Sequence, residues 1–236
     1  MQLFYAPQVR NNIFQLDETD SKHCVQVLRH NVGDLLVLAD GLGLFYEAQI
    51  EKAHPKCCSF VVKRTWHDES QPSVKLHIAI APPKNIARLE WFLEKVTEIG
   101  IAEITPLITQ RSERSEIKPD RLQKILVAAM KQSLKAQLPQ LHAPLKFKQF
   151  IQAHNTPQHY PIRCIPTVNP QNALLRDVYQ KGQDALMLIG PEGDFTPQEV
   201  QMATDAGFVP VSLGKSVLRV ETAGVFVCSL VQIANQ

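Results

Sequence analysis

Two strand–turn–helix segments near the end of the chain have the residue types that a ligand pocket needs. In the first, the apolar run at 185–189 predicts a buried strand, and Gly190-Pro191-Glu192-Gly193 interrupts it. A helix start follows, with Thr196 as its N-cap, Pro197 at its first position and Glu199 at its third. Such a turn exposes backbone N–H groups, which suit an anionic or carbonyl-rich ligand.

The second segment has the same organisation. Residues 209–213 predict a strand, Gly214 breaks it, and residues 215–221 lead into an apolar helix. The two turns together predict one ligand held between them, although each alone is also compatible with an ordinary strand-to-helix connection. Neither turn matches the phosphate-binding sequence G-x-x-x-x-G-K-[ST] or the three spaced glycines of a dinucleotide site.

The composition is that of an ordinary globular protein, with 44% hydrophobic residues in 236 and a net charge of +2. No apolar run approaches the length of a membrane span, and the first residues lack a basic and then apolar leader. We therefore expect a cytoplasmic protein without a membrane partner. The five cysteines lack C-x-x-C spacing and no His/Asp/Glu group has ligand spacing, so free thiols and no bound metal are expected.

Positive charge is concentrated in the middle of the chain. Residues 72–146 contain 12 Lys/Arg against 7 Asp/Glu, a net charge of +5, whereas the segments on either side are slightly acidic. A basic segment of this kind is suited to a polyanion such as RNA, although solvated helices often have a similar excess.

The pattern of apolar residues divides the chain into two domains. Residues 1–68 predict a small β-rich unit, with strands at 35–39, 44–50 and 59–62 and a short helix at 20–29. The polar stretch 67–72 is the expected linker. From residue 73 to 236, strands alternate with helices, which indicates an α/β domain with a parallel sheet covered on both faces. The expected strands lie at 74–80, 101–108, 160–165, 185–189 and 209–213, and the expected helices at 85–99, from 119 onward and at 222–234.

Several short motifs, in a fixed order along nearly the whole chain, resemble the ribosomal small-subunit methyltransferase E family of the SPOUT methyltransferases. They lie at His23–Arg29, Lys95–Ile101, Ile104–Leu107, Arg111–Glu113, Ile189–Gly193, Leu213-Gly214 and Val217–Ala223. The resemblance implies a PUA-like β-barrel domain that binds RNA, followed by a SPOUT α/β domain whose last part, about 160–236, forms a trefoil knot around the cofactor site. It also implies a homodimer that uses S-adenosyl-L-methionine to methylate N3 of a uridine in 16S rRNA of the small ribosomal subunit.

The sequence departs from the family pattern in three places. Asp194 replaces a glycine, although Asp tolerates the left-handed backbone better than most residues, so we expect the turn to persist. Lys215-Ser216 replaces a segment that commonly ends in Arg, which removes one cation beside the pocket. Lys131-Gln132-Ser133-Leu134-Lys135 replaces a more usual Glu-Gln-Ser/Cys-Gly-Arg run. These changes leave the reaction class intact and affect the expected contacts with RNA.

The expected chemistry requires a group that helps to remove the proton of uracil N3 or stabilises the resulting anion. Arg219 is the first candidate, as a cation beside uracil O2 or O4, and a salt bridge to Glu221 or Glu192 is its structural alternative. Glu221 is a candidate base, or a carboxylate that orients Arg219.

The remaining candidates follow from the turns and the basic segment. The residues expected to bind the cofactor are Ile165, Ile189, Gly190, Glu192, Gly193, Leu213, Gly214, Val217 and Leu218. Those expected to contact RNA are Arg29, Lys84, Arg88, Arg111, Arg114 and Lys131, each of which is otherwise a solvated surface cation.

Three other functions compete with this interpretation. The chain is alternatively a ribosome-assembly protein that binds RNA without catalysis, which the changes at Asp194 and Ser216 suggest. A second alternative is a methyltransferase of the same superfamily that acts on tRNA or on another rRNA site. A metal-dependent hydrolase is the least favoured, since no ligand spacing is visible.

Overall fold

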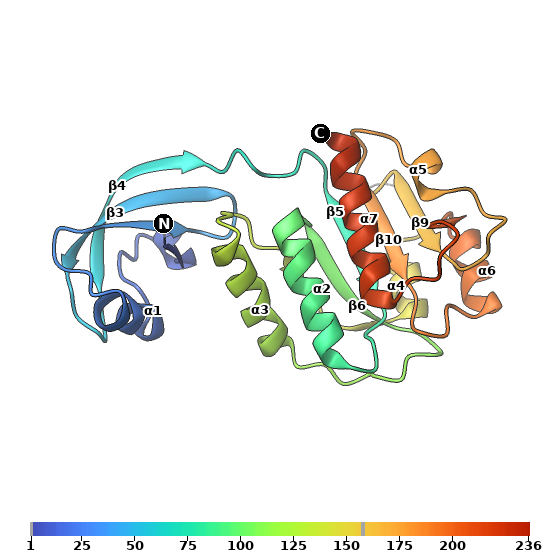
Figure 1. The fold of residues 1–236 in the computed structure, drawn as a ribbon, viewed down its shortest axis with the longest axis horizontal. Coiled ribbons are helices and arrows are strands. Elements are labelled where there is room, and N and C mark those ends of the chain that lie inside the picture. The colour runs from blue at the N-terminus through green and yellow to red at the C-terminus, as the bar shows by residue number, and fades with distance from the viewer. Residues whose placement is uncertain (1, 157–158) are drawn as a thin grey trace. The chain divides into compact units, whose positions relative to one another are not determined.

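The chain forms two compact units that interleave along the sequence. The computed structural model describes residues 2–156 and 159–236 (Figure 1). The first unit contains the residues up to Gln71 together with Val127–Leu138, and the second contains Pro72–Leu126 and Pro139–Gln236. The division at Gln71 lies within the expected linker, but the sequence pattern did not indicate that 127–138 would join the first unit. No helix among the described residues is long and apolar enough to span a membrane.

The first unit is built on a four-stranded sheet with the order β1-β2-β3-β4. Its strands are β1 (Leu3–Tyr5), β2 (Leu35–Ala39), β3 (Leu44–Lys52) and β4 (Ser59–His67). β1 pairs with β2 in parallel, and the other neighbours are antiparallel. A 3-10 helix η1 (Pro7–Asn11) follows β1, and α1 (Glu18–Lys22) continues directly into a π-helical turn η2 (His23–Val27). The three strands expected here are confirmed, whereas β1 had no signal in the apolar pattern.

The segment 127–138 belongs to the first unit through its packing and its hydrogen bonds. Met130 and Ala136 share a buried cluster with Leu3 and Phe45. The buried carboxylate of Asp68 accepts a hydrogen bond from the backbone N–H of Ala136 at 2.8 Å. A buried backbone N–H must find such an acceptor, so this contact secures the segment against the end of β4.

The second unit is built on a sheet in which every recorded pair of strands is parallel. The order is β11-β9-β10-β5-β6-β7, and β8 pairs with β6 further along. The strands are β5 (Leu76–Ile80), β6 (Glu103–Ile108), β7 (Gln140–Leu141), β8 (Leu145–Lys146), β9 (Ile162–Pro166), β10 (Ala185–Ile189) and β11 (Val209–Val211). The expected parallel sheet is therefore confirmed.

Helices cover both faces of this sheet (Figure 1). The helices that lie wholly in this unit are α2 (Ile86–Ile99), α4 (Phe147–Ala153), α5 (Leu175–Val178), α6 (Pro197–Asp205) and α7 (Val220–Asn235). A further helix, α3 (Pro119–Gln132), begins in this unit, and its residues from Val127 onward belong to the first. α2 and α7 pack together on one face, where Gly224 lies so close to the Phe92 ring that a Cβ atom would be 2.4 Å away. α4 and α6 pack over the buried side chains of the other face, which include Leu186 and Leu188.

The strand order places three chain turns at one edge of the sheet. β9 lies between β11 and β10, so the chain crosses over β9 when it runs from β10 through α6 to β11. Because these strands are parallel, the turns that follow β9, β10 and β11 all leave from the same edge. In parallel α/β sheets, ligands bind at the carboxyl edge of the strands.

The C-terminus of α3 has a leucine at a position that favours glycine. Leu134 has a φ of 54°, in the left-handed region. The N–H of Lys135 donates to the carbonyl of Met130 at 3.1 Å, and the N–H of Leu134 donates to the carbonyl of Lys131 at 3.3 Å. These two bonds form the helix-ending arrangement that usually has glycine at the left-handed residue. The family resemblance predicts glycine at this position, and the left-handed φ of Leu134 fits that expectation.

We predict that Leu134→Gly stabilises the protein. Glycine removes the strain of a left-handed L-residue, which should raise the free energy of unfolding by about 1 kcal/mol, as measured by urea denaturation. Leu134→Ala is the matched control, because it removes the half-exposed side chain but keeps the strain, and it should show no gain. A glycine variant no more stable than the alanine variant would contradict this interpretation.

Candidate active site

A pocket of about 670 Å³ opens at the carboxyl edge of the sheet in the second unit. Three turns and the helix start that follows the last of them form its walls, and Arg88 of α2 completes them. The lining residues of these segments are 166–168 and 170 at the end of β9 and beyond it, 189–194 at the end of β10 and beyond it, and 213–220 with Ala223 after β11. The two turns that the sequence predicted to share a ligand therefore lie on one pocket, together with the end of a third strand, β9, where Ile165 had been expected to contribute a further wall.

The turn after β10 is held tightly against the helix that follows. A Cβ atom on Gly190 would lie 3.1 Å from the Phe195 ring, so only glycine fits there without a shift of its neighbour. α6 begins with the expected capping box: Glu199 N–H donates to the Thr196 hydroxyl at 3.2 Å, and Thr196 N–H donates to the Glu199 carboxylate at 2.9 Å. The predicted helix start is thus confirmed residue by residue.

Asp194 joins the turns after β9 and β10. Its φ of 58° is left-handed, so the turn persists with Asp in the glycine position, as expected. One carboxylate oxygen accepts a hydrogen bond from the N–H of Phe195 at 2.8 Å, and the other accepts one from the N–H of Val168 at 3.1 Å. Glycine at this position would supply the backbone conformation but neither hydrogen bond.

The turn after β11 is more open. Gly214 has a φ of 123°, which L-residues rarely adopt, and a Cβ atom there would meet nothing within 4 Å. The strand end before it is fixed by Ser212, whose N–H donates to the carbonyl of Ala173 at 2.8 Å. Beyond the glycine, Val217 has 83% of its surface exposed although it lines the pocket. The pocket therefore has one firm wall around Asp194 and one wall with exposed apolar surface.

The ion pair at the start of α7 differs from the expected one. Glu221 is buried, and its Oε1 lies 3.7 Å from Nε of Arg88, so Glu221 pairs with Arg88 and not with Arg219. The other carboxylate oxygen of Glu221 is buried and has no hydrogen-bond partner among the described residues. Glu221 does not line the pocket, whereas both arginines do.

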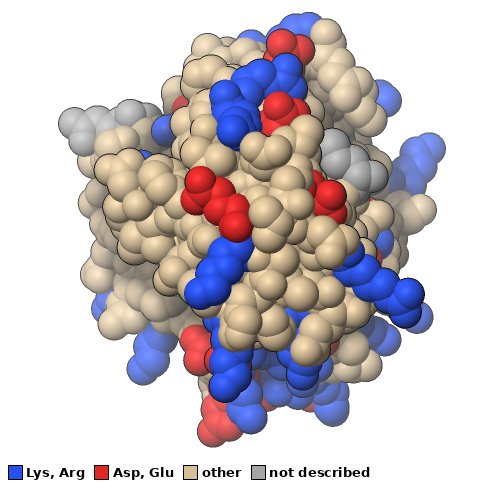
Figure 2. All heavy atoms as spheres, turned by 90° about the vertical axis from the view of Figure 1, so that its left-hand side faces the viewer, with Lys and Arg blue, Asp and Glu red and all other residues tan. Residues whose placement is uncertain are grey.

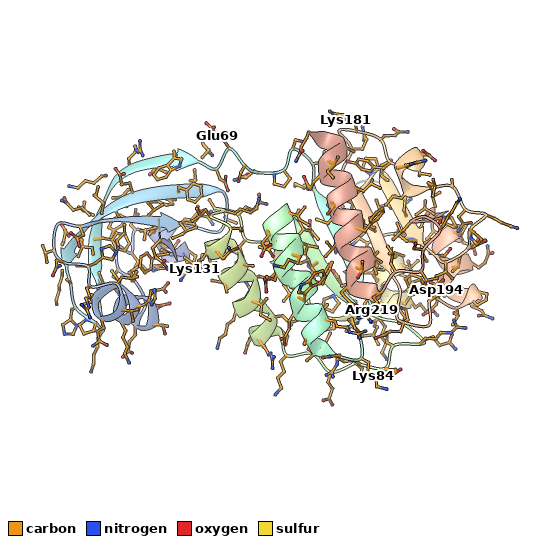
Figure 3. The ribbon with its side chains drawn as sticks, in the orientation of Figure 1. Glu69, Lys84, Lys131, Lys181, Asp194 and Arg219 are labelled. Atoms are coloured by element: carbon orange, nitrogen blue, oxygen red, sulfur yellow. The ribbon has the colours of Figure 1, made fainter. Side chains whose placement is uncertain are left out.

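Arg219 is the N-cap residue of α7, and its side chain is exposed. It makes no side-chain hydrogen bond or ion pair with the part of the chain that the structure describes. Figure 3 shows Arg219 at the same end of the second unit as Lys84 and Asp194, with Lys181 at the opposite end. Arg219 is therefore a pocket cation whose side chain is available to a ligand.

Other cations surround the turn after β10. Arg111 donates a hydrogen bond to the carbonyl of Gly193, and Arg114 donates two to the carbonyl of Lys84, at 3.1 and 2.9 Å. The ammonium of Lys84 lies 2.8 Å from Glu113, and this hydrogen bond raises the pKa of Lys84. The backbone N–H of Lys84 donates to Glu192 at 3.0 Å. Four of the six residues expected to bind RNA (Lys84, Arg88, Arg111 and Arg114) are thus brought together beside the pocket.

The other two expected RNA-binding residues lie in the first unit. Arg29 is exposed, with a left-handed φ of 59°. The ammonium of Lys131 is 3.0 Å from Asp20 and lies 5.6 Å from the centre of the Phe4 ring, and its side chain is mostly buried. The charge of Lys131 is therefore paired within that unit. On the face drawn in Figure 2, Lys and Arg are interrupted by acidic and uncharged residues.

Of the nine residues expected to bind the cofactor, Ile165 is the one that does not line the pocket. It lies within β9 and is fully buried in a core cluster of the second unit. The sequence reasoning missed Thr167, Val168 and Pro170. The position of 167–170 directly after an apolar strand was the signal that could have identified them.

Comparisons with known proteins agree with this architecture. Residues 69–232 match the model of an RNA methyltransferase domain, and residues 16–63 match that of an RNA methyltransferase PUA domain. A protein of Synechocystis named ribosomal RNA small subunit methyltransferase E is 33% identical over 211 residues, which cover 87% of this chain and 68% of that protein.

Two solved structures are similar over most of their length. The crystal structure of a probable rRNA-methyltransferase from Porphyromonas gingivalis has a TM-score of 0.92 and 41% identity, and covers 100% of this chain and 98% of the other. A putative methyltransferase from Legionella pneumophila, solved in complex with the bound cofactor SAM, has a TM-score of 0.82 and 30% identity, with 94% and 91% covered.

The parallel sheet, its pocket and the domain matches define an RNA methyltransferase with a PUA domain before the α/β unit. The chain belongs to the ribosomal RNA small subunit methyltransferase E family.

Variants of Asp194 should separate backbone strain from hydrogen bonding. Asp194→Gly removes the two hydrogen bonds but also relieves the strain of a left-handed L-residue, so the two effects largely offset each other and the free energy of unfolding should fall by less than about 1 kcal/mol. Asp194→Ala removes the same bonds and keeps the left-handed strain, so it should be roughly 1–2 kcal/mol less stable than the glycine variant. Urea denaturation of the two variants measures the difference, and equal stability would show that the left-handed backbone is not maintained.

Proposed function

We propose that this protein transfers a methyl group from S-adenosylmethionine to N3 of a uridine in 16S rRNA of the small ribosomal subunit. The pocket formed by the three turns is the observation that supports this most directly. The Legionella relative is solved with S-adenosylmethionine, and the curated relatives are named for the small-subunit rRNA.

The pocket fits this cofactor in size and chemistry. Its volume of about 670 Å³ lies in the usual range for small-molecule sites. Ile189, Leu213 and Leu218 offer apolar walls for an adenine ring. Gly190 and Gly193 allow the backbone of the turn after β10 to lie close to a ligand. Gly214, which has a left-handed φ, leaves the turn after β11 without a side chain at that position. We assign cofactor binding to these residues together with Glu192 and Val217, with Ile165 supporting the wall from the core.

The bound cofactor supplies an electrophilic methyl group. The protein must position uracil N3 and must help to remove its proton or stabilise the resulting anion. Arg219 lines the pocket and its guanidinium has no partner among the described residues, so we assign it the stabilisation of negative charge on uracil O2 or O4. Glu221 is buried behind Arg88, so we assign Glu221 the role of orienting Arg88, a second pocket cation, instead of removing the proton. Developing charge is stabilised most effectively by cations that are already oriented.

RNA binding is assigned to Lys84, Arg88, Arg111 and Arg114 beside the pocket, and to Arg29 on the PUA unit. Lys131 is left out, because its ammonium is paired with Asp20 and its side chain is mostly buried, whereas Lys84, although paired with Glu113, is exposed. The carbonyl contacts of Arg111 and Arg114 hold their guanidinium groups at the pocket rim, where RNA phosphates would approach.

Two further features are also proposals. The exposed apolar residues Phe226 and Ile233 of α7 and Trp91 of the adjacent α2 are suited to a homodimer interface, which sedimentation analysis tests. A trefoil knot in residues 160–236 is compatible with the crossover of the chain from β10 over β9 to β11. A cytoplasmic location fits the action on ribosomes.

The direct test is methyl transfer from isotopically labelled S-adenosylmethionine to unmethylated small ribosomal subunits, followed by analysis of the rRNA nucleosides. Label in 3-methyluridine at one position is the expected result. Label in another nucleoside, or in tRNA, would assign the chain to a different substrate. Absence of both label and cofactor binding would favour the ribosome-assembly alternative.

In the same assay, Arg219→Ala should reduce kcat by about 10²–10³-fold, since this is the cost of removing one stabilising group from a developing anion. The affinity for S-adenosylmethionine, measured by calorimetry, should change little. Arg219→Lys keeps the charge without the planar fork and should retain part of the rate. An equal loss of rate and cofactor affinity in the alanine variant would show that Arg219 is structural.

The affinity for RNA should fall steeply with salt, because phosphate contacts release counterions. Lys84→Ala should reduce the slope of log K against log [salt] by about 1, as expected for one lost phosphate contact. Lys181→Ala is the control, since Lys181 is an exposed cation at the opposite end of the same unit (Figure 3). Equal slopes for the two variants would remove Lys84 from the RNA-binding surface.

A further inference from the structure

A second cluster of chemically active side chains lies at the amino edge of the sheet, away from the pocket. His77 is the second residue of β5, and Glu103, the first residue of β6, is its register partner. His142 directly follows β7, and its backbone N–H donates to the carbonyl of Ile104 at 2.8 Å. Three segments far apart in the sequence thus bring two imidazoles and one carboxylate together. The spacing along the chain gave no sign of this group.

One atom from each of these side chains faces a common point. Nδ1 of His77, a carboxylate oxygen of Glu103 and a ring nitrogen of His142 all lie within 4.8 Å of one another. Nδ1 of His77 is 4.0 Å from Oε2 of Glu103, and Nε2 of His142 is 2.7 Å from the same oxygen. In a tetrahedral zinc site the ligand atoms are about 3.3 Å apart, so small side-chain adjustments in both directions would bring the three into ligand geometry.

Nδ1 of His77 is a buried polar atom that lacks a partner in the described part of the chain. His77 is only 2% exposed, and its Nδ1 has no hydrogen-bond partner among the described residues. A buried polar atom without a partner is costly, and native proteins rarely leave one without a reason. A metal ion is one partner that such a nitrogen can take.

The atoms that face away from the common point are held by neighbours. Nε2 of His77 is 2.8 Å from the hydroxyl of Thr105, and the Tyr160 hydroxyl donates to Oε1 of Glu103 at 2.7 Å. When His77 donates through Nε2, the lone pair of its Nδ1 is free for a ligand. Outer partners of this kind orient metal-binding histidines and carboxylates in known sites.

An ion can reach the cluster from solvent. Glu103 and His142 are part-exposed, which gives an ion a path from solvent.

We propose that His77, Glu103 and His142 bind a divalent transition-metal ion of the Zn²⁺ type, with the fourth position open to water. Two nitrogens and one oxygen are a donor set that zinc prefers over calcium or magnesium. The ion would join the starts of β5 and β6 to the segment after β7. Because the cluster lies at the sheet edge opposite the pocket, its role is to stabilise the α/β unit, and it takes no part in methyl transfer.

The test is equilibrium dialysis and calorimetry of the full chain, freed of metal with a chelator and titrated with ZnCl₂. The wild type should bind one ion per chain, and its melting temperature should rise with zinc, since a ligand that binds only the folded state stabilises it. His142→Ala and Glu103→Gln should each lose at least about tenfold in affinity, and Thr105→Val, which removes an outer partner, should lose about 10–100-fold.

His67→Ala is the matched control, because His67 is an exposed histidine of the first unit, and it should bind zinc like the wild type. Cys57→Ser serves the same purpose for the part-exposed thiol. Circular dichroism without zinc verifies that every variant is folded. No zinc binding by the wild type, or binding that survives in both His142→Ala and Glu103→Gln, would overturn the proposal and leave the cluster as a hydrogen-bonded group. Loss of binding in Cys57→Ser would place the ion on that cysteine.

Discussion

The carboxylate of Asp194 is the contact on which the pocket depends most. Its two oxygens accept hydrogen bonds from Val168 in the turn after β9 and from Phe195 in the turn after β10. Parallel strands bring these two turns to the same edge of the sheet. The hydrogen bonds of the β-ladder join the strands and do not extend to the turns. One side chain thus fixes two walls and leaves the third, after Gly214, open and apolar.

The distribution of charge follows from this arrangement. Most cations at the pocket are already engaged: Arg88 with Glu221, Arg111 with the carbonyl of Gly193, and Arg114 with the carbonyl of Lys84. The contacts of Arg111 and Arg114 position their guanidinium groups without neutralising them, because a carbonyl is a neutral acceptor, whereas Arg88 is paired with a carboxylate. Arg219 differs, since its side chain has no such partner among the described residues. A rim of fixed cations with one available arginine is suited to a polyanionic substrate whose base must be stabilised as an anion.

Much of this structure could be predicted from local patterns. The apolar runs predicted β10, the Thr196–Glu199 pattern predicted the start of α6, and the glycine breaks located two pocket walls. What could not be predicted depends on pairing between distant segments. The ion pair of Arg88 with Glu221 and the cluster around His77 both join elements whose proximity only the sheet order determines. Residues 127–138 joined the first unit through the buried carboxylate of Asp68, for which the sequence had no periodic signal.

The most direct test of the pocket is a titration of the ¹⁵N-labelled protein with S-adenosylmethionine, followed by the backbone amide resonances in NMR spectra. We predict saturable changes in amide chemical shift that are concentrated in the three turns, at 166–170, 189–194 and 213–220, with Val168 and Gly214 among them. The amides of the first unit and of the His77 cluster should be nearly unchanged. Shifts confined to another surface, or to one turn alone, would contradict the claim that three strand ends form a single site for the methyl donor.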